Sequence, residues 1–270
     1  MTNRLGIEML TLLGMPIVEH VELAAELGCV SISTGLGRLP MAMFGKEELY
    51  PEWSLTGNPS LCRDLKAALC ANGVHIGLGE GFRVAPGLEV EDFAAQLDIF
   101  ADLGARRINA IGLETDTGRA LDQFDRLCDM VTARGMRFLV EFAPPHALCD
   151  AAGALAVADR LGHERCGMML DAMHFFRSGG TVAQMADLPV IYAQMCDVPR
   201  AAPEGMDYMT EAMFNRLAPG EGELPLRDWV AALPTDCEIG LEVPNLAAIA
   251  AVGRREHAAR CVKAARALGA

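Results

Sequence analysis

The chain has 270 residues, of which 51% are hydrophobic and 22% are charged, a composition that excludes the disordered, collagen-like and low-complexity classes. The formal net charge is -13 and only three of the 23 basic residues are Lys, so no cationic patch is expected and nucleic acid is a disfavoured partner. The nine Cys include no CxxC pair, and the sequence shows neither a signal peptide nor an apolar run of about 20 residues. These features predict a cytoplasmic protein with reduced thiols and no membrane partner.

Short apolar segments rich in Val and Ile alternate with longer segments of helical periodicity along the whole chain. The predicted strands are residues 5–9, 29–33, 74–79, 107–111, 137–142, 167–171, 190–196 and 238–243. The clearest predicted helices are residues 16–27, 59–72, 90–103, 118–134, 150–161, 180–187, 226–233 and 254–268. Strands that alternate with helices pair in parallel, and eight such repeats predict a closed (β/α)₈ TIM barrel.

The main alternative is an open, doubly wound sheet. No glycine-rich phosphate loop follows the first predicted strand, and the GLGR segment at 35–38 lacks the third glycine and the helix that such a loop needs. No domain boundary is visible, so residues 1–270 are predicted to form one barrel domain. The longest irregular segments, 34–57 and 197–225, both follow strands, which places them on the C-terminal face where barrels build their active sites.

Four predicted strands end in a side chain with a metal-binding oxygen: Glu141, Asp171, Gln194 and Glu242. Any one of them alone could be a solvated strand end or a helix cap. If all four point into the barrel, their oxygen atoms converge at one rim, where the three carboxylates would repel one another unless a cation neutralised them. Oxygen-only ligands favour Mg²⁺ or Mn²⁺ over Zn²⁺, so the pattern predicts one such ion.

Four other residues near the same rim are candidates for substrate binding. His174 lies three residues after Asp171, past the strand rather than on a helix, although a lone His in an apolar segment can also be a core residue. Arg216 could hold a substrate carboxylate or hydroxyl with its planar guanidinium, or it could be a solvated charge. Glu80 ends the third strand, and Phe82 follows it.

The second half of the chain resembles the xylose isomerase-like TIM barrels, which include sugar epimerases, hydroxypyruvate isomerase, inosose dehydratase and endonuclease IV. The resemblance lies in successive strand-end segments, whereas the first half is similar only in its generic architecture. The segments are FLVEFAPP, MMLDAMHFFRSGG, YAQMCDVPRAAPEG, RLAPGEGEL and IGLEVPN.

The resemblance implies specific roles for the strand-end residues. The metal ligands of the family match Glu141, Asp171, Gln194 and Glu242. His174 matches the substrate-contacting histidine of the D-x-x-H motif, and Arg216 is similar in position to a substrate-binding arginine. Many members have His where this chain has Gln194, and Gln there, followed by DVPR and a PGxGE turn, is similar to the hydroxypyruvate isomerase branch.

These residues predict a metal-dependent isomerase or epimerase of a small hydroxy-carbonyl compound. The metal would hold a carbonyl oxygen and an adjacent hydroxyl and would stabilise the enediolate that forms when a neighbouring proton leaves. Glu141 and Glu242, on strands that can face each other across the rim, would exchange that proton as base and acid.

Three alternatives stay open at this point. A dehydratase of the inosose or dehydroshikimate type would use the same metal and proton abstraction but would expel a hydroxyl group. A phosphodiesterase resembling endonuclease IV is disfavoured by the acidic chain, which lacks the additional metal-binding His residues. A non-catalytic ligand-binding barrel is disfavoured because metal-binding residues stand at all four strand-end positions, although a fold does not guarantee chemistry.

Apolar residues are frequent in the predicted rim loops. They include the segment LTLLGMP after the first strand, residues 39–44 and Trp53 after the second, and Phe82 after the third. They predict either a lid over a substrate less polar than a free sugar, or the ordinary packing of a long loop, or a subunit interface of a homo-oligomer.

Overall fold

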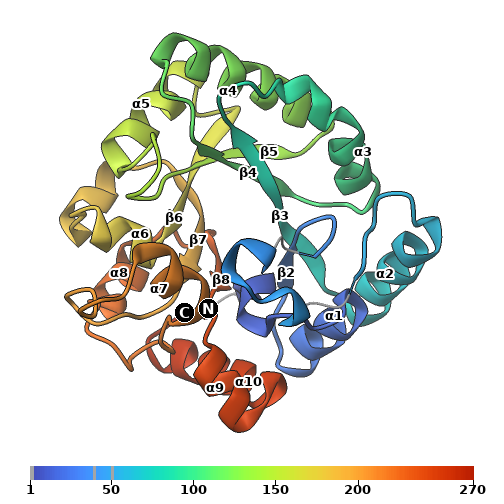
Figure 1. Cartoon of the computed structure of the whole chain (residues 1–270), viewed down its shortest axis with the longest axis vertical. Helices are drawn as coiled ribbons and strands as arrows, with labels where there is room; N and C mark the ends of the chain where they lie inside the picture. Colours follow the sequence, from blue (N-terminus) through green and yellow to red (C-terminus); the bar gives the residue numbers. More distant parts are fainter. Residues whose placement is uncertain (1–2, 39–40, 50–51) are drawn as a thin grey trace.

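The computed structural model describes residues 3–38, 41–49 and 52–270, and eight parallel strands form a closed barrel in these ranges. Each strand pairs with its neighbours in sequence order, and β1 closes the barrel by pairing with β8 through Gly6 and Gly240. The helices surround the strands as an outer ring (Figure 1). The predicted (β/α)₈ TIM barrel is therefore confirmed.

All eight predicted strands are present, with boundaries that differ by a few residues. The strands are β1 (Leu5–Ile7), β2 (Ser31–Thr34), β3 (His75–Val84), β4 (Arg107–Gly112), β5 (Arg137–Glu141), β6 (Cys166–Asp171), β7 (Val190–Met195) and β8 (Glu238–Leu241). The α-helices are α1 (Ile17–Glu26), α2 (Pro59–Asn72), α3 (Ala94–Asp102), α4 (Thr117–Thr132), α5 (Ala151–Leu161), α6 (Ala172–Arg177), α7 (Tyr208–Phe214), α8 (Leu226–Ala232), α9 (Leu246–Val252) and α10 (Arg254–Ala267).

Helices α6, α7 and α9, of six or seven residues each, were not among the predicted helices. The segment predicted as a helix over 180–187 contains instead a 3₁₀ helix over Val182–Asp187. The prediction that His174 lies outside a helix is wrong, because α6 begins immediately after Asp171 and the Asp171 carboxylate caps it by accepting the His174 amide at 2.8 Å.

Side chains of alternate strand residues fill the barrel in layers. Leu78, Leu139, Met169 and Tyr192 form one buried cluster, separate from the main core. Because strand residues two positions apart face the same side, Glu80, Glu141, Asp171 and Gln194 form the next polar layer toward the C-terminal end of the strands. The alternation that the sequence predicts thus brings these side chains to the mouth of the barrel.

Strand β3 breaks this alternation between Gly79 and Phe82, where its register against β4 shifts. Gly79 pairs with Ile108 and Phe82 with Ala110, so the two intervening residues occupy a bulge in which Gly81 has a φ of +107°. The bulge turns Phe82 away from the barrel. Glu80 therefore faces the inside of the barrel, whereas Phe82, two residues later, faces the outside.

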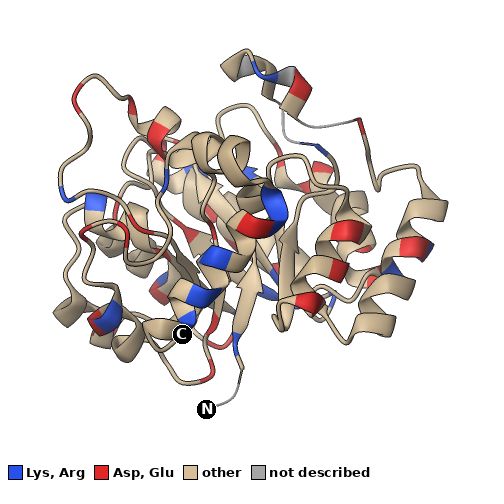
Figure 2. Ribbon diagram, turned by 90° about the horizontal axis from the view of Figure 1, so that it is seen from below, with Lys and Arg blue, Asp and Glu red and all other residues tan. Residues whose placement is uncertain are grey.

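A charged network closes the opposite end of the barrel, where the strands begin. Glu238 of β8 accepts hydrogen bonds from Arg107 at 2.6 Å and Arg106 at 3.0 Å, and it lies 2.8 Å from the His75 ring. Burial raises the pKa of Glu238, but the His75 hydrogen bond and the Arg107 charge outweigh it and lower that pKa to about 2. The C-terminus lies at this end (Figure 2).

A second apolar cluster covers part of the barrel mouth. Its buried members are Leu13, Met41 and Phe214, and the Phe44 ring packs edge-on against Phe214 with ring centroids 5.1 Å apart. Segment 41–49 thus packs against α7 and α9 and projects above the barrel (Figure 2). Two residues of the predicted lid, 39 and 40, lie outside the described residues.

Basic and acidic residues are interspersed over the outer helices (Figure 2), and several ion pairs, such as Lys66–Asp102 and Arg255–Glu26, join neighbouring helices. Within the described ranges, no helix combines the length and the apolar character needed to cross a membrane.

Candidate functional site at the barrel mouth

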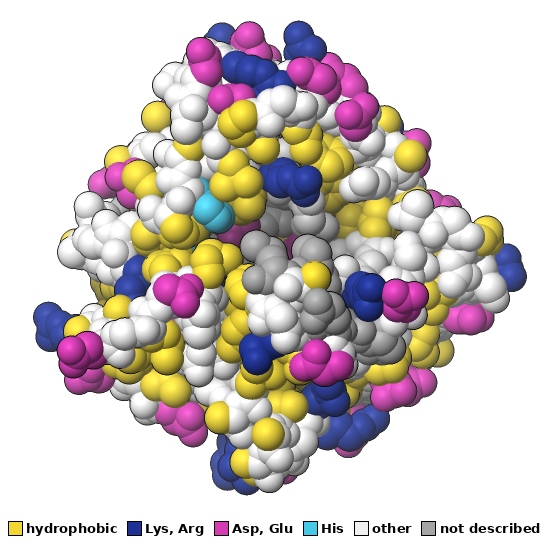
Figure 3. Space-filling view, in the orientation of Figure 1, with side chains coloured by type: hydrophobic (Ala, Val, Ile, Leu, Met, Phe, Trp, Pro, Cys, Tyr) yellow, Lys and Arg dark blue, Asp and Glu magenta, His cyan; other side chains and the backbone are white. Residues whose placement is uncertain are grey.

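The four strand-end residues lie together at the C-terminal end of the barrel. Glu141, Asp171 and Gln194 belong to β5, β6 and β7, and Glu242 directly follows β8. Asp171 and Gln194 are 1% exposed and Glu242 is 4% exposed, so the site is a desolvated one rather than a solvated rim. In the space-filling view, acidic side chains are visible in the depth of the central hollow (Figure 3).

Arg216 joins two of these residues. Its Nη1 atom lies 2.5 Å from Asp171 Oδ2 and 2.9 Å from Glu242 Oε2, while its Nε donates to the Ala212 carbonyl at 2.8 Å. Two carboxylates from β6 and β8 therefore converge on one point, which a cationic nitrogen occupies. Gln194 completes this side of the site by donating its Nε2 to Glu242 at 3.2 Å.

Two loops hold Arg216 in this position. The Arg216 amide donates to the Pro244 carbonyl at 3.1 Å, and Asn245 Nδ2 donates to the Arg216 carbonyl at 2.8 Å. Asp197 caps the loop after β7 by accepting the amides of Val198, Gly220 and Leu224. The segment after β7 is thereby fastened to the segment after β8.

Glu8 is a further site residue, which the sequence analysis missed. It follows β1, is fully buried, and accepts hydrogen bonds from the Tyr192 hydroxyl at 2.5 Å and from Gln194 Nε2 at 3.1 Å. A Cβ atom on Gly240 would collide with the Glu8 carboxylate, so the glycine makes room for it. The strand-end criterion that selects Glu141 and Asp171 also applies to Glu8 and would have found it.

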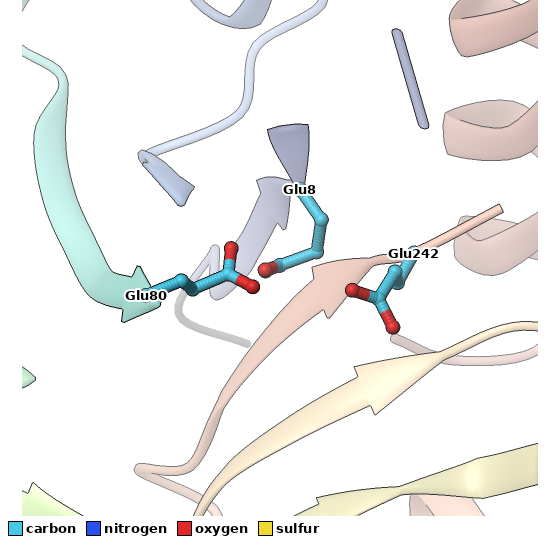
Figure 4. A group of neighbouring side chains, drawn as sticks. All are labelled: Glu8, Glu80 and Glu242. Carbon is cyan, nitrogen blue, oxygen red and sulfur yellow. The ribbon is translucent and has the colours of Figure 1, made fainter. Parts of the chain in front are cut away.

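Glu8, Glu80 and Glu242 form a compact acidic cluster. One carboxylate oxygen from each lies within 4.8 Å of the others, and the three side chains point toward a common space from β1, β3 and the end of β8 (Figure 4). Glu80 therefore lies in the polar layer, as its place in β3 predicts. The substrate-binding role predicted for it stays a prediction.

Glu141 occupies the other side of the site, between two partners. Asn109 Nδ2 donates to Glu141 Oε2 at 2.5 Å, and His174 Nε2 lies 3.8 Å from Glu141 Oε1. The side-chain oxygen of Asn109, Oδ1, is buried and has no hydrogen-bond partner among the described residues. The Nδ1 atom of His174 lies 2.6 Å from the hydroxyl of Tyr208 on α7.

Burial dominates the pKa values of the carboxyl groups. Burial and the Asp171 charge raise the pKa of Glu141 to about 8, and the hydrogen bond from Asn109 opposes this shift. Burial and the Glu8 charge likewise raise the pKa of Glu80 to about 8. The pKa values of Glu8 and Glu242 are also raised by burial. Asp171 differs, because the charges of Arg216 and His174 outweigh its burial and lower its pKa to about 2.

Burial lowers the pKa of His174 to about 4, so its ring is neutral at pH 7. Arg216 has a raised pKa, because its contacts with Asp171 and Glu242 outweigh burial. The site therefore combines a fixed positive charge and a neutral ring with carboxyl groups that bind either protons or a cation at neutral pH.

The residues at the mouth fit a divalent cation. The carboxyl groups share one desolvated space, and those of Asp171 and Glu242 converge on a single point. The side-chain oxygen of Asn109 is a buried acceptor that has no partner among the described residues. Oxygen donors of this kind suit a hard divalent cation. The buried acidic cluster thus indicates a divalent metal, although no feature of the donor set selects Mn²⁺ or Mg²⁺.

The prediction that Phe82 contacts substrate or belongs to a lid is corrected. Its side chain is 3% exposed and packs against Phe93 and Phe100, with ring centroids 5.1 and 5.8 Å away, in the layer between barrel and helices. The two-residue alternation would place Phe82 on the same face of β3 as Glu80. The bulge between them shifts this alternation, so the two side chains face opposite sides of the strand.

Phe82→Ala is accordingly expected to lower the free energy of unfolding by about 3–5 kcal/mol, the usual cost of truncating a buried Phe, without changing metal affinity. Chemical denaturation and titration with Mn²⁺ measure the two quantities. The control is Phe44→Ala. Because the Phe44 side chain is only half-buried, this substitution should lower the free energy of unfolding by less. An unchanged stability combined with weakened ligand binding would restore the lid interpretation.

Solved structures of three other proteins share this architecture. IolI, solved with a bound zinc atom, is 15% identical, with a TM-score of 0.76 and coverage of 98% of this chain and 96% of that chain. D-psicose 3-epimerase, solved with D-fructose, is 15% identical (TM-score 0.68; 98% and 99%). The probable 3-DHS dehydratase AsbF of Bacillus anthracis is 12% identical (TM-score 0.75; 99% of each chain).

At these identities the structural likeness shows the fold alone. A search of curated proteins finds no match. A family model, however, matches residues 21–264, which is most of the sequence and includes the segments that carry Glu80, Glu141, Asp171, Gln194 and Glu242. The chain belongs to the xylose isomerase-like TIM barrel family.

Proposed function

We propose that the protein is a divalent-metal-dependent isomerase or epimerase of a small hydroxy-carbonyl compound, such as a sugar or a hydroxy-keto acid. The observation that carries the proposal is the convergence of Asp171 and Glu242 on one point, with Gln194 bonded to Glu242. Glu141, whose side chain is 13% exposed, lies in the same layer. Membership of a family whose structural neighbours include an epimerase supports it.

Glu141, Asp171, Gln194 and Glu242 would hold the metal, and Mn²⁺ or Mg²⁺ suits their oxygen donors. The zinc atom bound by the IolI neighbour supports a divalent ion in this protein. When bound, such an ion supplies Lewis-acid polarisation of a carbonyl oxygen, which makes the adjacent C–H bond more acidic. Because Arg216 Nη1 contacts two of the proposed ligands, its positive charge balances them in the metal-free site.

The chain's own residues would move the proton. A carboxylate of Glu141 or Glu242 takes a proton from the carbon beside the carbonyl, and the opposing carboxylic acid returns a proton to carbon. Burial raises the pKa of Glu141 to about 8, near neutral pH, where both the acid and the base forms are useful, and burial also raises the pKa of Glu242. Asn109 would fix the orientation of Glu141 through its 2.5 Å hydrogen bond.

His174 and Arg216 would orient the substrate. Arg216 uses Nε and Nη1 for protein contacts, so its Nη2 is the nitrogen that would reach a substrate oxygen. The His174 ring lies beside Glu141 and would contact a neighbouring oxygen of the substrate.

Deuterium incorporation tests this proposal. The metal-loaded protein is incubated in D₂O with a panel of ketoses, aldoses and hydroxy-keto acids until equilibrium, and products are analysed by mass spectrometry and NMR. We expect deuterium on a product carbon without loss of water, because the carboxyl protons exchange with solvent over many turnovers. Glu91→Gln, which changes an exposed carboxylate of an outer ion pair, serves as the control.

A second candidate, a dehydratase, is kept because AsbF shares the fold. It would use the same proton abstraction but would protonate a departing hydroxyl group, so a product lighter by one water would favour it over the isomerase. If no compound exchanges or turns over with metal bound, the enzymatic proposal itself fails.

A further inference from the structure

Tyr208 lies over His174 at the barrel mouth and is held there firmly. It is the first residue of α7, whose N-terminus is capped by the Asp207 carboxylate. The helix is fixed to α6 by the Arg177–Glu211 ion pair at 2.6 Å. At its other end, Phe214 packs in the apolar cluster of the mouth. The Tyr208 hydroxyl is therefore a positioned group rather than a mobile surface one.

His174 has a different neighbour on each ring nitrogen. Nδ1 lies 2.6 Å from the Tyr208 hydroxyl, and Nε2 lies 3.8 Å from Glu141 Oε1. Asp171 Oδ1 is 3.5 Å from Nδ1, but it already accepts the His174 backbone amide at 2.8 Å. The Tyr208 hydroxyl is thus the strongest partner of Nδ1.

The two tautomers of the neutral ring differ in how well they fit these neighbours. When Nε2 carries the proton, the phenol donates to the Nδ1 lone pair and the Nε2–H group points toward a carboxyl oxygen. When Nδ1 carries the proton, the phenol oxygen must accept, and its hydrogen has no other acceptor among the described residues. The contact with Tyr208 therefore favours the proton on Nε2.

We propose that Tyr208 is a positioning residue that fixes His174 in the Nε2–H tautomer, so that the ring presents a hydrogen-bond donor to the site. The distance of 3.8 Å between Nε2 and Glu141 Oε1 is too long for a direct hydrogen bond. A substrate hydroxyl can bridge the two groups by accepting from Nε2–H and donating to Glu141. This second step rests on the proposed function, whereas the tautomer does not.

Nitrogen-15 NMR of histidine-labelled protein tests the tautomer directly, since protonated and unprotonated ring nitrogens have distinct chemical shifts. The spectrum is recorded at pH 7 without metal and with diamagnetic Mg²⁺, and His174→Gln identifies the signal. We expect Nε2 to be protonated in the wild-type protein. In Tyr208→Phe, which keeps the ring but removes the donor, we expect the signal to shift toward a mixture of tautomers. The control is Met209→Ala on the same helix, which should leave the His174 signal unchanged.

An Nδ1-protonated His174 in the wild-type protein would overturn the proposal, and so would an unchanged tautomer in a folded Tyr208→Phe. If the variant does not fold, the wild-type spectrum still decides. With an active substrate, Tyr208→Phe is expected to lower kcat/KM by up to about tenfold, the value of one hydrogen bond, at unchanged metal content. Failure to find a substrate would count against the proposed function but not against the tautomer.

Discussion

Addition of Mn²⁺ or Mg²⁺ is expected to raise the melting temperature of the metal-free protein, and to raise it more at pH 8 than at pH 5. Burial raises the pKa values of Glu80 and Glu141 from 4.5 to about 8. Their protonated forms thus favour the folded state, fully at pH values below 4.5. This contribution is lost as the pH rises through about 8, because desolvated carboxylates must then ionise. A bound cation removes that cost.

The size of this effect follows from mass action. Metal at one hundred times its Kd contributes about 2.7 kcal/mol, which corresponds to a rise of roughly 5–10 °C for a domain of this size. Differential scanning calorimetry with and without metal across this pH range measures it. Glu238→Gln at the opposite end of the barrel is the matched control and should keep the metal-dependent rise. A rise that is independent of pH would contradict the proposed role of the buried carboxyl groups.

Glu141→Gln and Glu242→Gln are each expected to lower kcat by about 10²–10⁴, the usual contribution of a positioned acid or base. The amide keeps the size of the side chain and one oxygen atom but cannot exchange a proton with carbon. Glu141→Gln should not lose stability at pH 8, because it removes a group that is costly to ionise. Glu242→Gln is expected to lose some stability, because it removes a partner of the buried Arg216. Steady-state kinetics, metal analysis and thermal denaturation separate these effects.

The control for these variants is again Glu91→Gln, whose exposed side chain pairs with Arg126. Full activity in Glu242→Gln would remove the two-carboxylate mechanism while leaving the metal site intact. Loss of the metal in both variants would show that their carboxylates act mainly as ligands.

The sequence predicted the barrel and its polar layer because both depend on short periodic patterns. Eight apolar strands and the two-residue alternation are enough to bring Glu141, Asp171 and Gln194 to one end of the barrel. The prediction for Phe82 was wrong for a local reason. A bulge at Gly81 moves Phe82 to the outer face of β3, and the apolar pattern of the sequence does not reveal such a bulge.

Residues from short or irregular segments were harder to predict. Helix α7 has seven residues, too few for a clear helical period, and so no sequence pattern marks Tyr208. The sequence singled out Arg216, but its contacts with Asp171 and Glu242 depend on loops whose course is set by the long-range bonds of Asp197 and Asn245. Asn109 was missed because it lies within a strand rather than at its end.

The site offers two sets of oxygen ligands that share Glu242. One set is Glu141, Asp171, Gln194 and Glu242, and the other is the acidic cluster of Glu8, Glu80 and Glu242. Only the first lies beside His174, which would orient the substrate.

A crystal structure of the protein soaked in Mn²⁺, with anomalous scattering collected, distinguishes the two sets. We expect one ion bound by Glu141, Asp171, Gln194 and Glu242, with Arg216 displaced from its bridge between Asp171 and Glu242. An ion held by Glu8, Glu80 and Glu242 alone, or no ion in excess Mn²⁺, would contradict the proposed metal centre.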